Sequence, residues 1–156
     1  MSLSTLCQRC GLCCDGSLFT HVPLRGAEPD RARRLGLPVV ARADGSPALR
    51  QGCAALDGLR CTVYAERPES CRKYHCLLYA ALAEGEVELD EALEVVDEAR
   101  GHIQHLEAAL PPAEEANPAS ALERARRDAA SGALPAPASD ALKRAETFLD
   151  LHFRGR

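Results

Sequence analysis

The chain has 156 residues, about the length of one domain, with eight cysteines but only three Phe, three Tyr and no Trp to fill a core. Its net charge of -4 is uneven, because residues 1–80 carry 11 Lys and Arg against 7 Asp and Glu, whereas residues 81–156 carry 8 against 16. No apolar run approaches the roughly 18 residues of a membrane span, so we expect no membrane partner.

Four thiols lie within eight residues near the N-terminus: Cys7, Cys10, Cys13 and Cys14. The two-residue gap between Cys7 and Cys10 would let both thiolates of a tight turn converge on one ion, and Cys13 repeats the gap. Three cysteines at this spacing can hold three corners of an iron-sulfur cluster, and Gly11 would let the backbone turn close to the sulfurs. Adjacent side chains diverge, so Cys14 should serve a second centre.

Four further cysteines complete the set of eight: Cys53, Cys61, Cys71 and Cys76. An even count also allows a disulfide framework. However, residues 1–6 show neither the basic nor the apolar region of a secretion signal, so we expect a cytoplasmic protein, in which clustered thiols bind metals. We therefore predict two metal centres, zinc and/or an iron-sulfur cluster, that use all eight cysteines.

Metal binding would also cancel the positive charge of the N-terminal half. Eight thiolates add eight negative charges and two divalent ions return four positive ones, so we expect no nucleic-acid surface. Four arginines lie within four residues of a cysteine, where they would lower the pKa of thiols and offset thiolate charge: Arg9, Arg60, Arg67 and Arg72. Solvated surface arginines are the alternative.

Short strands and turns are predicted between the two cysteine clusters. We expect a strand over residues 18–22, a helix over 29–35, and strands over 39–41 and 48–50 beside an Asp44-Gly45 turn. A second hairpin, turning at Asp57-Gly58, would carry Cys53 and Cys61 on its two arms.

A helix is then predicted over residues 67–83. Pro68 suits its first position, and Cys71 would lie in its first turns, where the helix dipole favours a thiolate. Cys76 follows five residues later, about 140° around an ideal helix, so the two thiols should face different metals. His75 could be a ligand, but eight cysteines already complete two four-ligand sites, so we expect it to be neutral and exposed.

The cysteine pattern resembles a known family. The start reads Cys-x2-Cys-Gly-x-Cys-Cys, and the later cysteines are accompanied by Tyr64, Arg67-Pro68, Arg72 and Tyr74. This is similar to the YkgJ family, also called the CxxCxxCC zinc- or iron-chelating domain, over about the first half of the chain. The resemblance implies a small cysteine-cluster protein that binds zinc or iron, often labelled an iron-sulfur protein. Flagellin lysine methylases share the cysteine pattern, but they are longer and this chain lacks their additional regions.

The Ala/Glu-rich tail lies outside this resemblance and predicts about three helices. A seven-residue repeat over 89–110 is ended by Pro111-Pro112, and its seam is formed by Leu89, Ala92, Val96, Ala99, Ile103, Leu106 and Leu110. A second helix should run from an Asn117-Pro118 cap to about Ser131. A third should be capped by Ser139, with one face formed by Leu142, Ala145, Phe148 or Leu149, and His152. Local packing is favoured over an intermolecular coiled coil, because Pro-rich turns separate short helices.

Together these patterns predict an α+β fold. Residues 1–84 would form a YkgJ-like, metal-stapled module of short hairpins and helices, which depends on metal to fold, and residues 85–156 a helical region. We interpret the chain as a metal-binding cysteine-cluster protein, a binding or structural module whose acidic helices would contact a protein partner. The alternative is an iron-sulfur redox or methylase-like enzyme, with Tyr64, Arg67, Arg72 and Tyr74 beside one cluster. The spacing of the first three cysteines favours at least one iron-sulfur cluster in the cell, with zinc as the occupant after aerobic expression.

Overall fold

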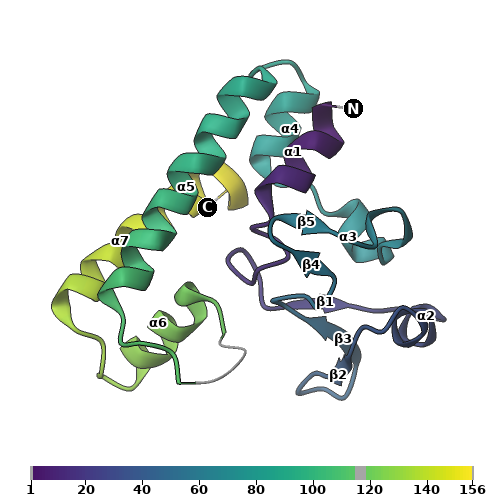
Figure 1. Ribbon diagram of the computed structural model, residues 1–156, viewed down its shortest axis with the longest axis horizontal. Coiled ribbons are helices and arrows are strands. Elements are labelled where there is room, and N and C mark those ends of the chain that lie inside the picture. The colour runs from purple at the N-terminus through teal and green to yellow at the C-terminus, as the bar shows by residue number, and fades with distance from the viewer. Residues whose placement is uncertain (1, 115–118, 156) are drawn as a thin grey trace.

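The computed structural model describes residues 2–114 and 119–155, and its elements confirm the α+β class (Figure 1). The strands are β1 (His21–Pro23), β2 (Val39–Ala41), β3 (Pro47–Arg50), β4 (Leu56–Asp57) and β5 (Arg60–Cys61). The helices are α1 (Ser2–Cys10), α2 (Glu28–Arg34), α3 (Glu69–Lys73), α4 (Leu77–Ala83), α5 (Leu89–Ala109), α6 (Ala121–Ala130) and α7 (Ala136–Leu149), with a 3-10 turn η1 (Tyr64–Glu66) and a π-helical end η2 (Asp150–Arg154).

The strands form two small antiparallel sheets. In the first, β3 lies between β1 and β2, and in the second β4 pairs with β5. The predicted strands at 39–41 and 48–50 and the Asp57-Gly58 hairpin are confirmed, although Cys53 precedes β4 instead of lying on it. The strand expected over 18–22 begins only at His21, because Leu18 is buried in the helical core described next.

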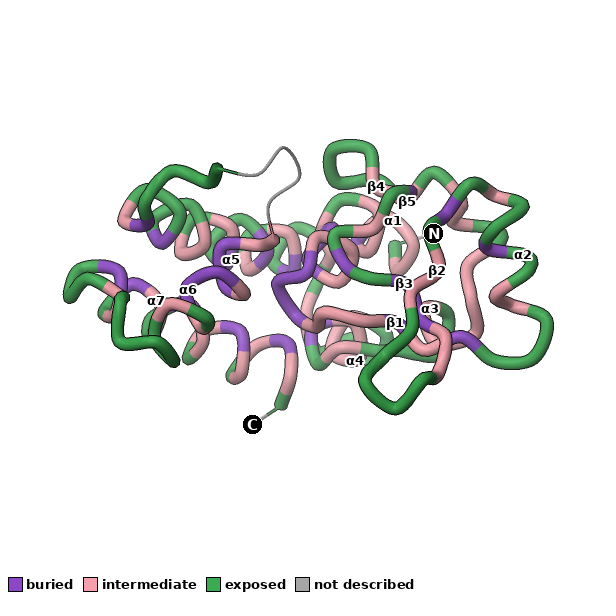
Figure 2. Tube along the Cα trace, turned by 90° about the horizontal axis from the view of Figure 1, so that it is seen from below, coloured by how far each residue is buried: buried purple, intermediate pink, exposed green. Residues whose placement is uncertain are grey.

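Two apolar cores hold these elements together (Figure 2). The smaller core lies between the three-stranded sheet and α2 and includes Val22, Ala32 and Leu49. The larger core is formed by α5, α6 and α7, and it also takes in Leu12 and Leu78 from the cysteine-rich half of the chain. Gly85 follows α4 at the predicted boundary with a φ of 78°, yet the larger core extends across that boundary.

Helix α5 confirms most of the predicted heptad seam. Ala92, Val96, Ala99 and Leu106 are buried, and the helix packs against α7 and α1 within the chain. This is the local packing that the Pro-rich turns predict. Within the part of the chain that the structure describes, no helix is long and apolar enough to cross a bilayer.

Helices α6 and α7 begin at Ala121 and Ala136. Helix α6 is capped by Ser120, whose Oγ accepts a hydrogen bond from the backbone N–H of Glu123 at 3.2 Å, whereas the expected Asn117-Pro118 cap lies outside the described residues. The cap expected at Ser139 is wrong, because α7 begins three residues earlier, at Ala136. Pro137 lies in its first turn, where a proline costs no backbone hydrogen bond.

The single helix predicted over 67–83 is also wrong. The chain leaves α3 at Tyr74, where ψ is 122°, and α4 starts only after Cys76. Cys76 has an extended backbone, and its Sγ accepts a hydrogen bond from the backbone N–H of Tyr79 at 3.3 Å. A thiol therefore caps α4, which neither the helical periodicity nor the position of Pro68 predicts.

Candidate metal centre

All eight cysteines line one cavity of about 120 Å³, and all are free thiols of intermediate exposure. They come from six places in the chain. Cys7 and Cys10 lie on α1, and Cys13 and Cys14 lie on the segment that follows it, residues 11–17, here called the cysteine loop. Cys53 precedes β4, and the other thiols lie on β5, on α3 and at the start of α4: Cys61, Cys71 and Cys76.

The first two thiols share a helix instead of the expected tight turn. Cys7 and Cys10 are three residues apart in the last turn of α1, a spacing that places both side chains on one face of a helix. Gly11 then ends the helix with a φ of 69°, a conformation that other residues rarely adopt. A Cβ at Gly11 would also lie 3.2 Å from the carbonyl oxygen of Leu59, so the loop approaches its neighbours closely.

Backbone hydrogen bonds bring the later thiols to the cysteine loop. The N–H of Cys53 donates to the carbonyl oxygen of Cys14 at 2.8 Å. The N–H of Cys61 donates to the side-chain oxygen of Gln8 on α1 at 3.1 Å. The two-stranded sheet is thus attached to α1 and the segment before it to the loop, and together they bring Cys61 and Cys53 to the cavity wall.

A carboxylate on α2 positions Cys71. Glu28 accepts hydrogen bonds from the backbone N–H groups of Arg25 at 2.8 Å and of Glu69 at 2.6 Å. It therefore satisfies a free donor at the start of α3, two residues before Cys71. Ser70 adds a hydrogen bond from its Oγ to the carbonyl oxygen of Pro23 at 3.0 Å. Local sequence gave no signal for Glu28, because its role depends on a contact between residues 41 positions apart.

The thiols divide into two sets of four by their electrostatic neighbours. The first set, here called group one, is Cys7, Cys10, Cys13 and Cys76, and the second, group two, is Cys14, Cys53, Cys61 and Cys71. Apart from the contact of Cys13 with its neighbour Cys14, every resolved repulsion between thiols stays within one group.

Packing separates six of the same residues. Cys10, Cys13 and Cys76 pack against the larger, helical core. Cys53, Cys61 and Cys71 pack against the smaller core beside the sheet. Cys13 and Cys14 fall into different groups, and so do Cys71 and Cys76, although the unbroken helix from which the second separation was predicted is absent.

Burial raises the pKa of seven of these thiols, and repulsion between thiols adds to it for most of them. Burial, with smaller repulsions from neighbouring thiols, raises the pKa of Cys10 to about 12. Burial, with repulsion from Cys61, also raises the pKa of Cys14 to about 12. Burial also raises the pKa of Cys71 to about 11 and that of Cys13 well above its usual value.

Two arginines act against this trend. Arg67 lowers the pKa of Cys7 in group one and of Cys71 in group two, although the effect of burial is larger. The sequence predicts this effect of Arg67 on neighbouring thiols. Its guanidinium carbon lies 3.6 Å from the centre of the Tyr64 ring, and its Nε donates to the carbonyl oxygen of Tyr64 at 2.9 Å. Arg100, on α5, lowers the pKa of Cys10, and local sequence gave no signal for it.

The donor set fits zinc or iron. Thiolate sulfur is the usual ligand of both structural zinc ions and iron-sulfur clusters, and a bound cation would replace the repulsion within each group by attraction. Among the residues that the structure describes, no three Cys, His, Asp or Glu side chains converge closely enough to hold an ion as they stand. Binding would therefore draw the thiols of a group together, which couples metal uptake to local folding.

The wall of the cavity also carries polar and aromatic side chains. Tyr64, Arg67, Arg72 and Tyr74, which the sequence suggested beside the thiols, all line it. His75 is exposed, as expected, and stacks on Tyr79 with the ring centres 4.4 Å apart.

The fold and this cavity define an α+β cysteine-cluster protein. The family model CxxCxxCC, described as "Putative zinc- or iron-chelating domain", matches residues 6–97. This is more than half of the chain, so the protein belongs to that family. The match reaches into α5, which corrects the expectation that the whole Ala/Glu-rich tail lies outside it. No curated protein and no solved structure matches the chain.

Proposed function

We propose that the protein is a metal-binding module with two centres, each held by four cysteines. One centre uses group one, Cys7, Cys10, Cys13 and Cys76, and the other uses group two, Cys14, Cys53, Cys61 and Cys71. The observation that carries this proposal is the cavity, which is lined by all eight thiols of a chain that belongs to a zinc- or iron-chelating family.

The division into centres rests on two independent features. Electrostatic neighbours and packing against two different cores both separate Cys76 from Cys71. Electrostatic neighbours alone place Cys13 with Cys10, Cys76 and Cys7, and Cys14 with Cys61, Cys53 and Cys71. Four thiols per centre match the coordination number of structural zinc and the four cysteines of an iron-sulfur cluster.

Single substitutions in the two groups test the proposal. Wild-type protein purified without chelator and loaded with zinc should bind about two equivalents. Cys76→Ser and Cys71→Ser should each lose one equivalent, and the double variant should bind none tightly. Zinc content by mass spectrometry of the native protein would measure this. Loss of both equivalents in either single variant would contradict two separate centres.

The identity of the metal is a finer part of the proposal. The i, i+3, i+6 spacing of the group-one cysteines on α1 and the cysteine loop is typical of iron-sulfur sites, so we propose at least one iron-sulfur cluster in the cell. Anaerobic purification followed by visible absorption and Mössbauer spectroscopy would test this. A colourless protein that holds only zinc, and that refuses cluster reconstitution, would leave structural zinc as the function.

A second candidate function is an enzyme that uses one cluster. It is favoured by the cavity wall, where Tyr64, Arg67, Arg72 and Tyr74 lie beside the thiols and offer cationic and hydroxyl groups to a ligand. Such a redox or methylase-like enzyme requires a redox-active cluster, so the anaerobic experiment also tests this candidate.

A further inference from the structure

The cysteine loop is held by hydrogen bonds to its backbone carbonyl groups. Two of these bonds are local, from the N–H of Asp15 to Gly11 at 2.9 Å and from the N–H of Leu18, just after the loop, to Leu12 at 3.1 Å. Two others come from the segment before β4, since the side-chain nitrogen of Gln51 binds the carbonyl of Cys13 at 3.0 Å and the N–H of Cys53 binds that of Cys14. The backbone on both sides of the two adjacent thiols is therefore fixed.

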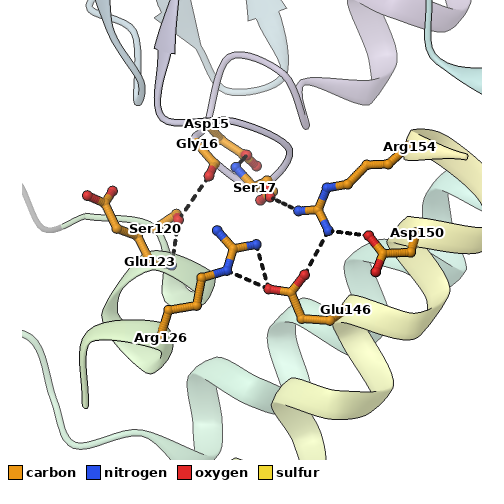
Figure 3. A network of polar contacts seen from close by, with 9 residues as sticks. All are labelled: Asp15, Gly16, Ser17, Ser120, Glu123, Arg126, Glu146, Asp150 and Arg154. Atoms are coloured by element: carbon orange, nitrogen blue, oxygen red, sulfur yellow. Dashed lines mark hydrogen bonds and ion pairs between the residues drawn. The ribbon is translucent and has the colours of Figure 1, made fainter. Parts of the chain in front are cut away.

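The end of the loop is held by the C-terminal helices instead (Figure 3). Ser120, at the start of α6, donates from its Oγ to the carbonyl oxygen of Gly16 at 3.2 Å. Arg154, at the end of η2, donates from Nη2 to the carbonyl oxygen of Ser17 at 2.9 Å. These donors lie 104 and 137 residues away from their acceptors in the sequence.

Arg154 is itself held rigidly. Its side chain is only 6% exposed, and its Nη1 binds Glu146 at 2.7 Å and Asp150 at 2.9 Å. Arg126 on α6 binds the same Glu146, with its Nε at 2.6 Å from Oε1, and so joins α6 to α7 (Figure 3). The two carboxylates compensate the positive charge of the buried guanidinium at Nη1, and its Nη2 remains directed at the loop.

We propose that Arg154 is a positioning residue for the group-two centre, and this inference rests on the proposed metal-binding function. By holding the carbonyl of Ser17, three residues after Cys14, it fixes the backbone that orients this thiolate. Contacts that orient a ligand from outside the coordination sphere commonly change metal affinity 10- to 100-fold when removed. The helical region thereby controls how readily the metal leaves, although it supplies no cysteine.

The test compares metal release from Arg154→Gln with release from the wild type and from Arg126→Gln. Arg126→Gln is the matched control, because it removes a cation from the same Glu146 while the bond from Arg154 to Ser17 remains. With zinc as the probe and a chromophoric chelator in excess, R154Q should release one of its two equivalents about 10-fold faster. That equivalent should be the one missing in Cys71→Ser, and R126Q should release both as the wild type does.

Cobalt(II) supplies a readout that a purely structural role would not change. The visible d–d absorption of bound cobalt reports ligand geometry, so it should shift for the group-two site of R154Q and stay unchanged in R126Q. If R154Q does not fold, R154K replaces it. Lysine keeps a charge beside Glu146 and Asp150 but lacks the planar fork that also reaches Ser17, so the same faster release is expected.

Three results would overturn the proposal: unchanged release and cobalt spectra in R154Q, equal acceleration of both equivalents, or the same acceleration in R126Q. A wild type that binds no metal would instead refute the proposed function itself. The two failures are therefore distinguishable.

Discussion

Gly11 joins the helix that carries the first two thiols to the loop that carries the next two. Its φ of 69° ends α1, and a Cβ there would lie 3.0 Å from Nη2 of Arg100 and 3.2 Å from the carbonyl oxygen of Leu59. The Arg100 guanidinium also donates to the carbonyl oxygen of Cys10, directly before the glycine. Any side chain at this position would disturb both the turn and the contact with α5.

We therefore expect Gly11→Ala to lower the free energy of unfolding by about 2 kcal/mol or more, from backbone strain and crowding together. Gly132→Ala is the matched control, because Gly132 has a similar φ of 76° and no atom of the described residues lies within 4 Å of a Cβ built there. It should cost about 1 kcal/mol, from backbone strain alone. Urea unfolding of the two variants would measure the difference, and equal costs would mean that the close approach at Gly11 is unimportant.

The elements show what sequence patterns can predict here. The hairpin turns at Asp44-Gly45 and Asp57-Gly58 and the heptad seam of α5 are local signals, and the structure confirms them. The break between α3 and α4 was missed because residues 69–83 contain no proline or glycine to mark it. The chain is extended there, and Cys76 caps α4 instead of lying inside a helix.

In the candidate metal centre, too, only local features could be predicted from the sequence. That Cys13 and Cys14 should face different centres follows from the divergence of adjacent side chains, and they do fall into different groups. The partners of each thiol could not be predicted, because they depend on contacts such as Glu28 with Glu69 and Gln8 with Cys61, which join distant segments. Arg100 and Arg154 were missed for the same reason.

Helix α5 supplies the element-scale prediction. Glu88 and Glu91 form a capping box at its start, in which the Glu91 carboxylate accepts from the backbone N–H of Glu88 at 2.8 Å. Glu88→Ala should lower the free energy of unfolding by about 1 kcal/mol, because the backbone N–H of Glu91 loses the side-chain acceptor that caps it. Glu86→Ala, at an exposed carboxylate just before the helix, is the control and should change it little. Thermal unfolding followed by circular dichroism would compare them, and similar midpoints would argue against the cap.

At the scale of the whole molecule, the larger core joins the helices to the cysteine-rich half through Leu12 and Leu78, among others. Even so, the strands are short and the smaller core has few buried side chains, so metal binding should supply much of the stability of residues 1–80.

A strong chelator should therefore remove hydrogen-exchange protection from residues 1–80, while residues 89–153 keep their helical signal. Hydrogen exchange with mass spectrometry, before and after chelation, would locate the loss, and circular dichroism would follow the helices. Equal protection of the N-terminal half in both states would mean that the fold does not need the metals.

We propose that two metals divide the eight cysteines into group one and group two. Anomalous X-ray diffraction from crystals of zinc-loaded protein, recorded on both sides of the zinc absorption edge, tests it most directly. We expect two anomalous peaks, each about 2.3 Å from four sulfurs, one among Cys7, Cys10, Cys13 and Cys76 and the other among Cys14, Cys53, Cys61 and Cys71. A single peak, a peak bound by thiols of both groups, or sulfurs paired as disulfides would contradict it.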